Sequence, residues 1–166
     1  MTSEEWLSDR APGFKELPTQ DRGAIVDFAF LWSLFESQIM ENFGRADRIR
    51  DKVDEWAAAG NLQADGYDDA LLYFRDRYFG NGAFSQHFED LGLRKADHPA
   101  VVQSVIDGTS NDPRDRMLAL LMIVWRLRNN LFHGKKWDYG LSGQLDNFRH
   151  ANAILMRVLE RHGAIG

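Results

Sequence analysis

Apolar residues recur at helical spacing along most of the chain. In six stretches they stand three or four positions apart, the period that places them on one face of an α-helix. Each stretch is followed by a glycine, the residue favoured in the left-handed turn after a helix end: Gly44, Gly60, Gly80, Gly108, Gly134 and Gly163. No β-type alternation competes with this period. The pattern therefore predicts six helices.

The first, fifth and sixth of these helices are expected to form the core. The first begins behind Thr19, a candidate N-cap, and carries one apolar stripe made of Ile25, Phe28, Trp32, Phe35 and Ile39. The fifth opens at Asp112-Pro113, because a capping carboxylate precedes a proline at the first helical position, and it runs to His133. The sixth is expected over about residues 141–162.

The other segments are expected to lie outside this core. The second and third helices, near residues 46–59 and 68–79, are more charged, and a short helix follows His98-Pro99. Residues 80–97 have no sustained period, which indicates a loop region with a short turn. We expect residues 1–18 to form a flexible N-terminal segment and residues 19–166 to form a single domain. The predicted fold is an all-α, antiparallel bundle of five to six helices.

Composition fits a folded chain and gives an acidic balance. Hydrophobic residues make up 44% of the sequence, with 11 Phe and 5 Trp, which is far too apolar for a disordered chain. The formal net charge of −5 argues against broad, charge-driven binding of nucleic acid. Between Leu118 and Trp137, however, all formally charged residues are basic: Arg126, Arg128, Lys135 and Lys136. This window is a candidate local phosphate site.

Other site classes find little support in the sequence. The chain has no cysteine, which excludes disulfides and thiolate metal sites and fits a reducing cytoplasmic compartment. The first residues show no leader pattern, and nowhere do eighteen apolar residues follow one another, so no membrane association is expected. The histidines stand at no metal-ligand spacing, and no nucleophile elbow or glycine-rich phosphate loop appears. We therefore expect a soluble, cytoplasmic protein without metal or cofactor.

Polar side chains crowd the end of the otherwise apolar fifth helix, in the segment Arg126-Leu-Arg-Asn-Asn-Leu-Phe-His133. Burial of such groups needs a structural or chemical reason. Arg128 and His133 are five positions apart, about 140° around an ideal helix, whereas Asn129 shares a face with His133. Three explanations stay open: Arg128 reaches around the helix, Gly134 loosens the last turn, or Arg128 of a second subunit completes the site.

Simpler interpretations stand beside a catalytic one. Arg126, Asn130 and His133, at spacings of four and three, share one face of the helix, as Arg128 and His133 do not. Arg126 is therefore an alternative to Arg128 as a ligand for phosphate. Basic residues and histidine also favour helix C-termini because of the helix dipole. Lys135 and Lys136 are either phosphate-positioning residues or plain surface charge.

The Arg128-Asn-Asn-Leu-Phe-His133-Gly segment resembles the R-x4-H signature of the HEPN superfamily, and the longer phrase from Arg126 is similar to its Apea-like bacterial branch. Trp32-Ser-Leu-Phe-Glu36 is similar to the aromatic-plus-acid pattern on the family's first helix. The resemblance implies a helical bundle that forms homodimers, in which two R-x4-H segments meet in one cleft. It also implies metal-independent endoribonuclease activity, with His133 and Arg128 as catalytic residues and Asn129 orienting phosphate or imidazole. Glu36 then orients the site, pairs with an arginine across the bundle, or is a solvated acid.

Three functional hypotheses follow from these residues. The first is an endoribonuclease of a bacterial toxin-antitoxin or anti-phage system, which acts on RNA, leaves a 2′,3′-cyclic phosphate and has an antitoxin or nucleotidyltransferase-type partner. The second is a non-catalytic HEPN module that binds nucleotide or RNA, or scaffolds a partner protein. The third is a helical adaptor without a ligand, for which the Arg-Asn-Asn-Leu-Phe-His phrase is a coincidence.

Overall fold

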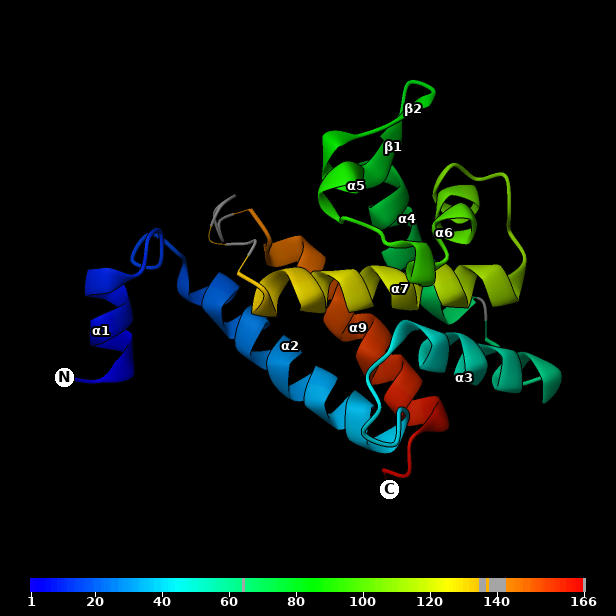
Figure 1. The fold of residues 1–166 in the computed structure, drawn as a ribbon, viewed down its shortest axis with the longest axis horizontal. Coiled ribbons are helices and arrows are strands. Elements are labelled where there is room, and N and C mark those ends of the chain that lie inside the picture. The colour runs from blue at the N-terminus through cyan, green and yellow to red at the C-terminus, as the bar shows by residue number, and fades with distance from the viewer. Residues whose placement is uncertain (64, 135–136, 138–142, 166) are drawn as a thin grey trace.

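The structure, a computed structural model, describes residues 1–63, 65–134, 137 and 143–165, and it is an all-α helical bundle (Figure 1). The six expected helices are all present: α2 (Thr19–Gln38), α3 (Ala46–Ala58), α4 (Asp68–Tyr78), α6 (Pro99–Ile106), α7 (Pro113–Phe132) and α9 (Leu145–His162). The predicted fold class is therefore confirmed. Two further short helices among the described residues are α1 (Ser3–Arg10) and α5 (Gln86–Asp90).

The core forms where α2, α7 and α9 approach one another. Helix α2 packs along α9, and the rings of Phe28 and Phe148 lie 5.1 Å apart between them. Helix α7 runs through the middle of the molecule, with α3 and α6 packed against it (Figure 1). Its residues from Met117 to Val124 are all buried, which explains why the hydrophobic run there shows no polar face.

Helices α3 and α4 contribute more to the core than their charged sequences indicate. Each is amphipathic, and the inner face is completely enclosed: Val53 of α3 and Phe74 of α4 are 0% exposed. The charged residues that suggested a peripheral place lie on the opposite, solvent-facing sides. The two helices are thus outer layers of the bundle whose inner faces belong to the same core.

Local capping signals place only some helix ends correctly: Gly60, Gly108 and Gly134 have the expected positive φ, whereas Gly44, Gly80 and Gly163 do not. The Asp112 carboxylate accepts a hydrogen bond from the backbone N–H of Asp115 at 3.1 Å, as expected of an N-cap. Thr19, in contrast, is the first residue of α2, and Pro18 occupies the N-cap position without a side-chain bond. The expected cap was one residue off, because proline already holds the extended backbone that this position requires.

The segment expected to be a loop holds regular structure. Strands β1 (Phe79–Gly80) and β2 (Ala83–Phe84) pair antiparallel around Asn81-Gly82, whose φ values of 53° and 78° fit a tight two-residue hairpin turn. The rings of Phe79 and Phe84 lie 5.1 Å apart across the hairpin. Helix α5 and the short 3-10 helix η2 (Lys95–Asp97) follow. The hydrophobic spacing over residues 80–97 did not predict these elements, because each is too short to show a repeating pattern of apolar residues.

The N-terminal segment also contains structure. Thr2 and Glu5 form a reciprocal capping box that starts α1, although this helix buries none of its residues. Glu4 of α1 forms an ion pair with Arg22 of α2, at 2.6 Å. Leu17, just before α2, is 3% exposed and packs into the protein. Helix α1 thus stands at the edge of the bundle (Figure 1).

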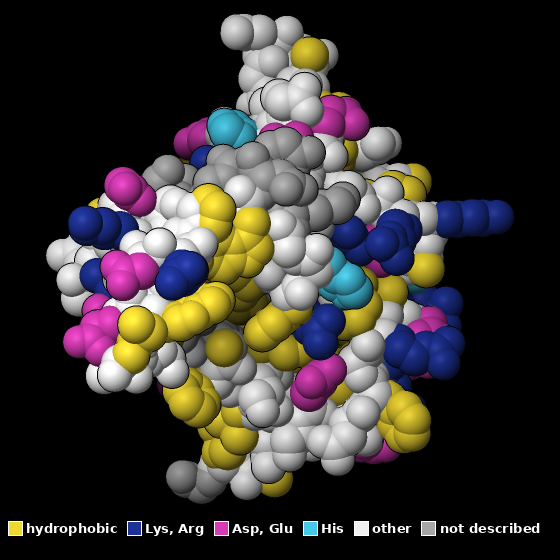
Figure 2. All heavy atoms as spheres, turned by 60° about the vertical axis from the view of Figure 1, so that its left-hand side comes forward, with side chains coloured by type: hydrophobic (Ala, Val, Ile, Leu, Met, Phe, Trp, Pro, Cys, Tyr) yellow, Lys and Arg dark blue, Asp and Glu magenta, His cyan; other side chains and the backbone are white. Residues whose placement is uncertain are grey.

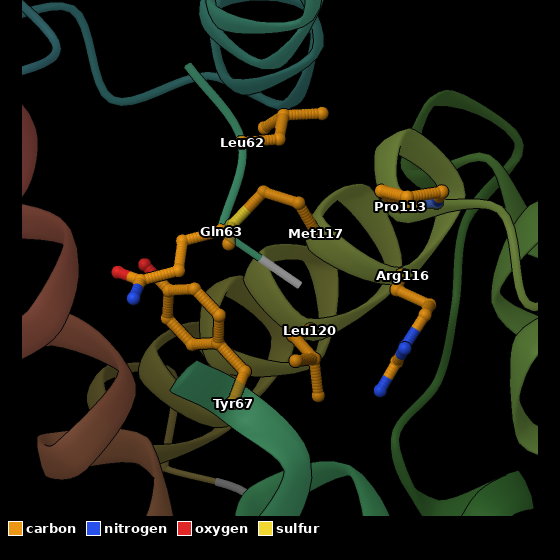
Figure 3. A pocket seen from close by; sticks show the side chains of 7 residues that line it. All are labelled: Leu62, Gln63, Tyr67, Pro113, Arg116, Met117 and Leu120. Carbon is orange, nitrogen blue, oxygen red and sulfur yellow. The ribbon is translucent and has the colours of Figure 1, made fainter. Parts of the chain in front are cut away.

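One small cavity lies near the start of α7, between Leu62, Tyr67 and Met117 (Figure 3). Its volume is about 10 Å³, which is room for no more than one water molecule. The surrounding side chains close around it, so it offers no ligand site. None of the helices in the described ranges is both long enough and apolar enough to cross a membrane.

Candidate functional site at the end of helix α7

His133 occupies the C-cap of α7 and its imidazole faces solvent. Its backbone N–H still bonds to the carbonyl of Asn129 at 2.9 Å, but its φ and ψ of −91° and 11° have left the helical range. Gly134 follows with φ of +79°, the left-handed conformation that ends the helix. In the described part of the chain no group hydrogen-bonds to the imidazole. The side chain is therefore free to contact a ligand.

Arg128 lies one turn earlier, in a half-buried aromatic environment. The centre of its guanidinium is 5.2 Å from the ring of Phe132, 5.8 Å from that of Trp125 and 6.0 Å from that of Trp32. Nη1 donates a hydrogen bond to Oδ1 of Asn129 at 3.0 Å, while Nε is buried with no partner among the described residues. Three rings and one amide thus fix the orientation of this cation.

Asn129 orients Arg128 rather than His133 in this structure. Among the residues described, no hydrogen bond or ring contact joins Arg128 to His133, as the angular separation of the two positions predicts. The end of α7 therefore presents two separate groups: the guanidinium of Arg128, which Asn129 and three aromatic rings contact, and the exposed imidazole of His133. Of the three explanations left open, the loosened turn at Gly134 is observed, but it does not bring these two side chains into contact.

Arg126 and Asn130 have a different environment, inside the protein. Arg126 is 2% exposed, and its Nε donates to the carbonyl of Leu91 at 3.0 Å. Asn130 is 3% exposed and donates to the same carbonyl at 3.1 Å. The two side chains thus hold the segment after α5 against α7. Burial of Arg126 thus gives it a structural role and makes Arg128 the more accessible of the two arginines for a phosphate.

A buried carboxylate, Asp97, completes this arrangement and was not identified from the sequence. It is 2% exposed and lies 3.6 Å from Nη1 of Arg126. Its oxygens accept hydrogen bonds from the indole N–H of Trp125 at 3.2 Å and the backbone N–H of Arg94 at 2.8 Å. Burial lowers the pKa of Arg126, and the Asp97 carboxylate opposes that shift. Both members of this ion pair are therefore buried inside the protein.

Glu36 lies beyond the motif, near the end of α2. Its carboxylate packs against Gly44 so closely that it leaves no room for a Cβ at that position. It makes no hydrogen bond or ion pair with Arg128 or His133, all three being described residues. The aromatic residue of the same pattern, Trp32, does reach the site, since its ring lies 5.7 Å from Trp125. Lys135 and Lys136 lie outside the described residues.

Two of the other histidines, His150 and His162, have structural surroundings. His162 stacks on Trp56 with ring centroids 3.8 Å apart, and burial lowers its pKa to about 4. His150 stacks on Tyr73 at 4.3 Å, and burial lowers its pKa as well. No three histidine or carboxylate side chains converge as metal ligands within the described ranges. His133 differs from His150 and His162 in standing exposed beside an arginine.

Comparison with known proteins adds no family to this geometry: no family model, no curated protein and no solved structure matches the chain.

Proposed function

We propose that this protein is a metal-independent endoribonuclease of the HEPN type, acting as a toxin or anti-phage effector in the cytoplasm. The observation that carries the proposal is the exposed imidazole of His133, one turn beyond the ring-held guanidinium of Arg128. A histidine titrates near neutral pH and is suited to move protons in RNA cleavage. The resemblance of the Arg128–His133 segment to R-x4-H supplies the reaction class.

The proposed reaction needs one base, one acid and a stabilising cation. A neutral His133 takes the proton of the ribose 2′-hydroxyl, whose oxygen attacks the adjacent phosphorus. The bond to the 5′-oxygen breaks, and a protonated histidine gives that oxygen its proton, which leaves a 2′,3′-cyclic phosphate. Arg128 stabilises the charge that gathers on the phosphate oxygens. Asn129 acts as a positioning residue because it accepts a hydrogen bond from Arg128.

Two copies of the chain supply the second histidine in this proposal. One copy offers a single exposed imidazole at the end of α7, and its own Arg128 does not contact it. A homodimer that joins two such helix ends provides an acid, a base and two guanidiniums. The antitoxin or nucleotidyltransferase-type partner of the proposed system would control access to this cleft.

The direct test is digestion of total RNA by the wild-type protein and by His133→Ala. We expect cleavage by the wild type and at least a hundredfold slower cleavage by the variant, since loss of a general acid-base typically costs on the order of 10²- to 10⁴-fold. The exposed position of His133 leaves no cavity on truncation, so thermal unfolding should be nearly unchanged. Equal digestion by both proteins would remove His133 from the mechanism.

A non-catalytic module that binds RNA or nucleotide, or scaffolds a partner protein, is the second candidate. One observation favours it: the guanidinium of Arg128 already contacts three aromatic rings and Asn129, as a structural cation would. In that case RNA binding, measured by fluorescence anisotropy, would occur without cleavage under any condition. Binding without cleavage in both wild type and His133→Ala would therefore select this second function.

A further inference from the structure

The outward face of α2 is unusually apolar for a surface helix. From Gly23 onward its exposed positions recur at spacings of three, one and three, and they are Gly23, Val26, Asp27, Phe30, Ser33, Leu34 and Ser37. Asp27 is the single charged residue among them. Surface helices normally carry several charges on their outer side, and a helix that is apolar all round is normally buried. The face thus combines three exposed apolar side chains with a single charge, which makes it a candidate interface.

Three large side chains form the centre of this face. Phe30 is 73% exposed, Val26 is 53% exposed and Leu34 is 37% exposed, and they stand four residues apart in one row. On the face of the molecule turned forward in Figure 2, hydrophobic side chains gather around a hollow. We call Val26, Phe30 and Leu34 the α2 row.

Grooves border the α2 row on both sides. The first, of about 720 Å³, lies between α2 and α1 and reaches Leu131 and Phe132 at the end of α7. The second, of about 660 Å³, lies between α2 and α9. Asn152 and Met156 of α9 line the second groove.

We propose that the α2 row is the surface on which a second copy of this chain docks, with a two-fold axis passing through Phe30. The residue types are symmetric about that position. In an antiparallel pairing of two α2 helices, Phe30 meets the partner's Phe30, and Val26 meets the partner's Leu34. Asp27 lies opposite the partner's Ser33, a hydrogen-bond donor. Every large apolar side chain then covers another, and no like charges meet.

This docking deepens the proposed function, because it brings the two candidate sites close together. Leu131 and Phe132 of α7 border the same groove as Val26 and Ala29 of α2. Ala29 and Val26 stand one and four positions along α2 from Phe30, where the axis passes. At a rise of about 1.5 Å per residue, the α7 ends of both copies lie beside the centre of the interface. Because His133 follows Phe132 directly, this docking brings the two helix ends that carry the imidazoles toward each other. An interface of this kind needs about 800 Å² from each copy, so the groove walls also contribute.

The chain contains no cysteine, which permits a direct test of the two-fold axis by single cysteines. A residue on the axis faces its own copy, so Phe30→Cys should form a disulfide-linked dimer under mild oxidation. Val26→Cys and Leu34→Cys should cross-link most efficiently when the two variants are mixed. Leu72→Cys on α4, where Leu72 is 60% exposed, is the matched control and should stay uncross-linked.

Sedimentation velocity provides the second measurement. Wild-type protein should be dimeric at micromolar concentration, and Phe30→Glu should weaken association by about 30-fold or more, as loss of an interface hot spot does. Leu72→Glu should leave association unchanged. Because Phe30 is largely exposed within one copy, the variant should keep its helical circular dichroism spectrum.

Two results would overturn the inference: a monomeric wild type at these concentrations, or a dimer that survives Phe30→Glu and gives no Phe30→Cys cross-link. RNA digestion, measured separately, tests the proposed function. A dimer that cross-links through residue 30 and leaves RNA intact supports the docking surface and counts against the ribonuclease. Cleavage by a dimer that lacks this cross-link supports the ribonuclease and places its interface elsewhere.

Discussion

The indole N–H of Trp125 donates a hydrogen bond to the buried carboxylate of Asp97, 28 residues earlier in the chain, across 3.2 Å. The same indole ring lies 5.8 Å from the guanidinium of Arg128. One side chain therefore contacts both the internal ion pair of Asp97 with Arg126 and the candidate catalytic arginine. The 3-10 helix η2 before α6 and the site at the end of α7 are joined through this residue.

Asp97→Asn should destabilise the protein strongly. The substitution leaves the buried guanidinium of Arg126 without its countercharge, and breaking a buried pair in this way costs about 3–5 kcal/mol. Urea unfolding followed by circular dichroism measures the loss. Asp76→Asn, on the exposed side of α4, is the control and should change stability by less than about 0.5 kcal/mol. A shift as small as the control's would mean that the pair contributes little.

Arg128→Lys should lose RNA cleavage although the positive charge remains. An ammonium group cannot offer two parallel N–H donors to a phosphate, and it lacks the planar surface that packs against the rings around Arg128. The measurement is the cleavage rate of a labelled RNA, with Arg157→Lys on the exposed side of α9 as the matched control. Full activity in Arg128→Lys would show that charge alone suffices.

Cleavage should persist in excess EDTA, because the proposed mechanism uses His133 and Arg128 alone. The assay compares rates before and after chelation, followed by return of single divalent ions. Loss of cleavage on chelation, with recovery on addition of one particular ion, would contradict a metal-independent reaction. Thermal unfolding in the same buffers separates a catalytic effect of the ion from a structural one.

Stability should fall as the pH is lowered from about 6.5 to about 4, partly because of His162. Burial against Trp56 lowers the folded-state pKa of His162 to about 4. As the pH falls, the imidazole is therefore protonated first in the unfolded chain, and this protonation stabilises the unfolded chain relative to the native state. The contribution is present above about pH 6.5 and lost below about pH 4. Because His162 is partly exposed, we expect about 1 kcal/mol from it.

His162→Leu is the variant that isolates this contribution. His150 also has a pKa lowered by burial and changes stability in the same direction, so wild-type data alone do not separate the two histidines. Urea titration at several pH values gives the difference between the unfolding free energies of wild type and variant. This difference should change with pH between about 4 and about 6.5 and should be constant outside that range. An identical pH dependence in both proteins would assign the effect to other groups.

The helices were predictable because their signals are local. Asp112 and Pro113 mark the start of α7 within two adjacent residues, and the stripe containing Phe28 and Trp32 follows from spacing alone. The hairpin at Asn81-Gly82 was missed because its strands are two residues long, too short for a period. The all-α architecture therefore came from the sequence, whereas the small elements before α6 did not.

The candidate site was predictable only in part. The sequence placed Arg128, Asn129 and His133 at one helix end, and the structure agrees on that position. It did not distinguish Arg126 from Arg128, because both are arginines two positions apart, and burial of one depends on Leu91 and Asp97, more than 25 residues away. Long-range partners of this kind leave no trace in local spacing.

The burial of Arg126 and Asn130 also bears on how this motif can change during evolution. Both side chains hold the segment after α5 to α7, so their loss would harm the fold whether or not the protein cleaves RNA. Under the proposed function, a descendant that lost catalysis is therefore expected to keep these two residues while Arg128 and His133 drift. Selection on architecture and selection on chemistry would then act on different positions of one helix. Retention of the Arg126-x-x-x-Asn130 pair is consequently no indicator of activity, and the exposed histidine is the informative position.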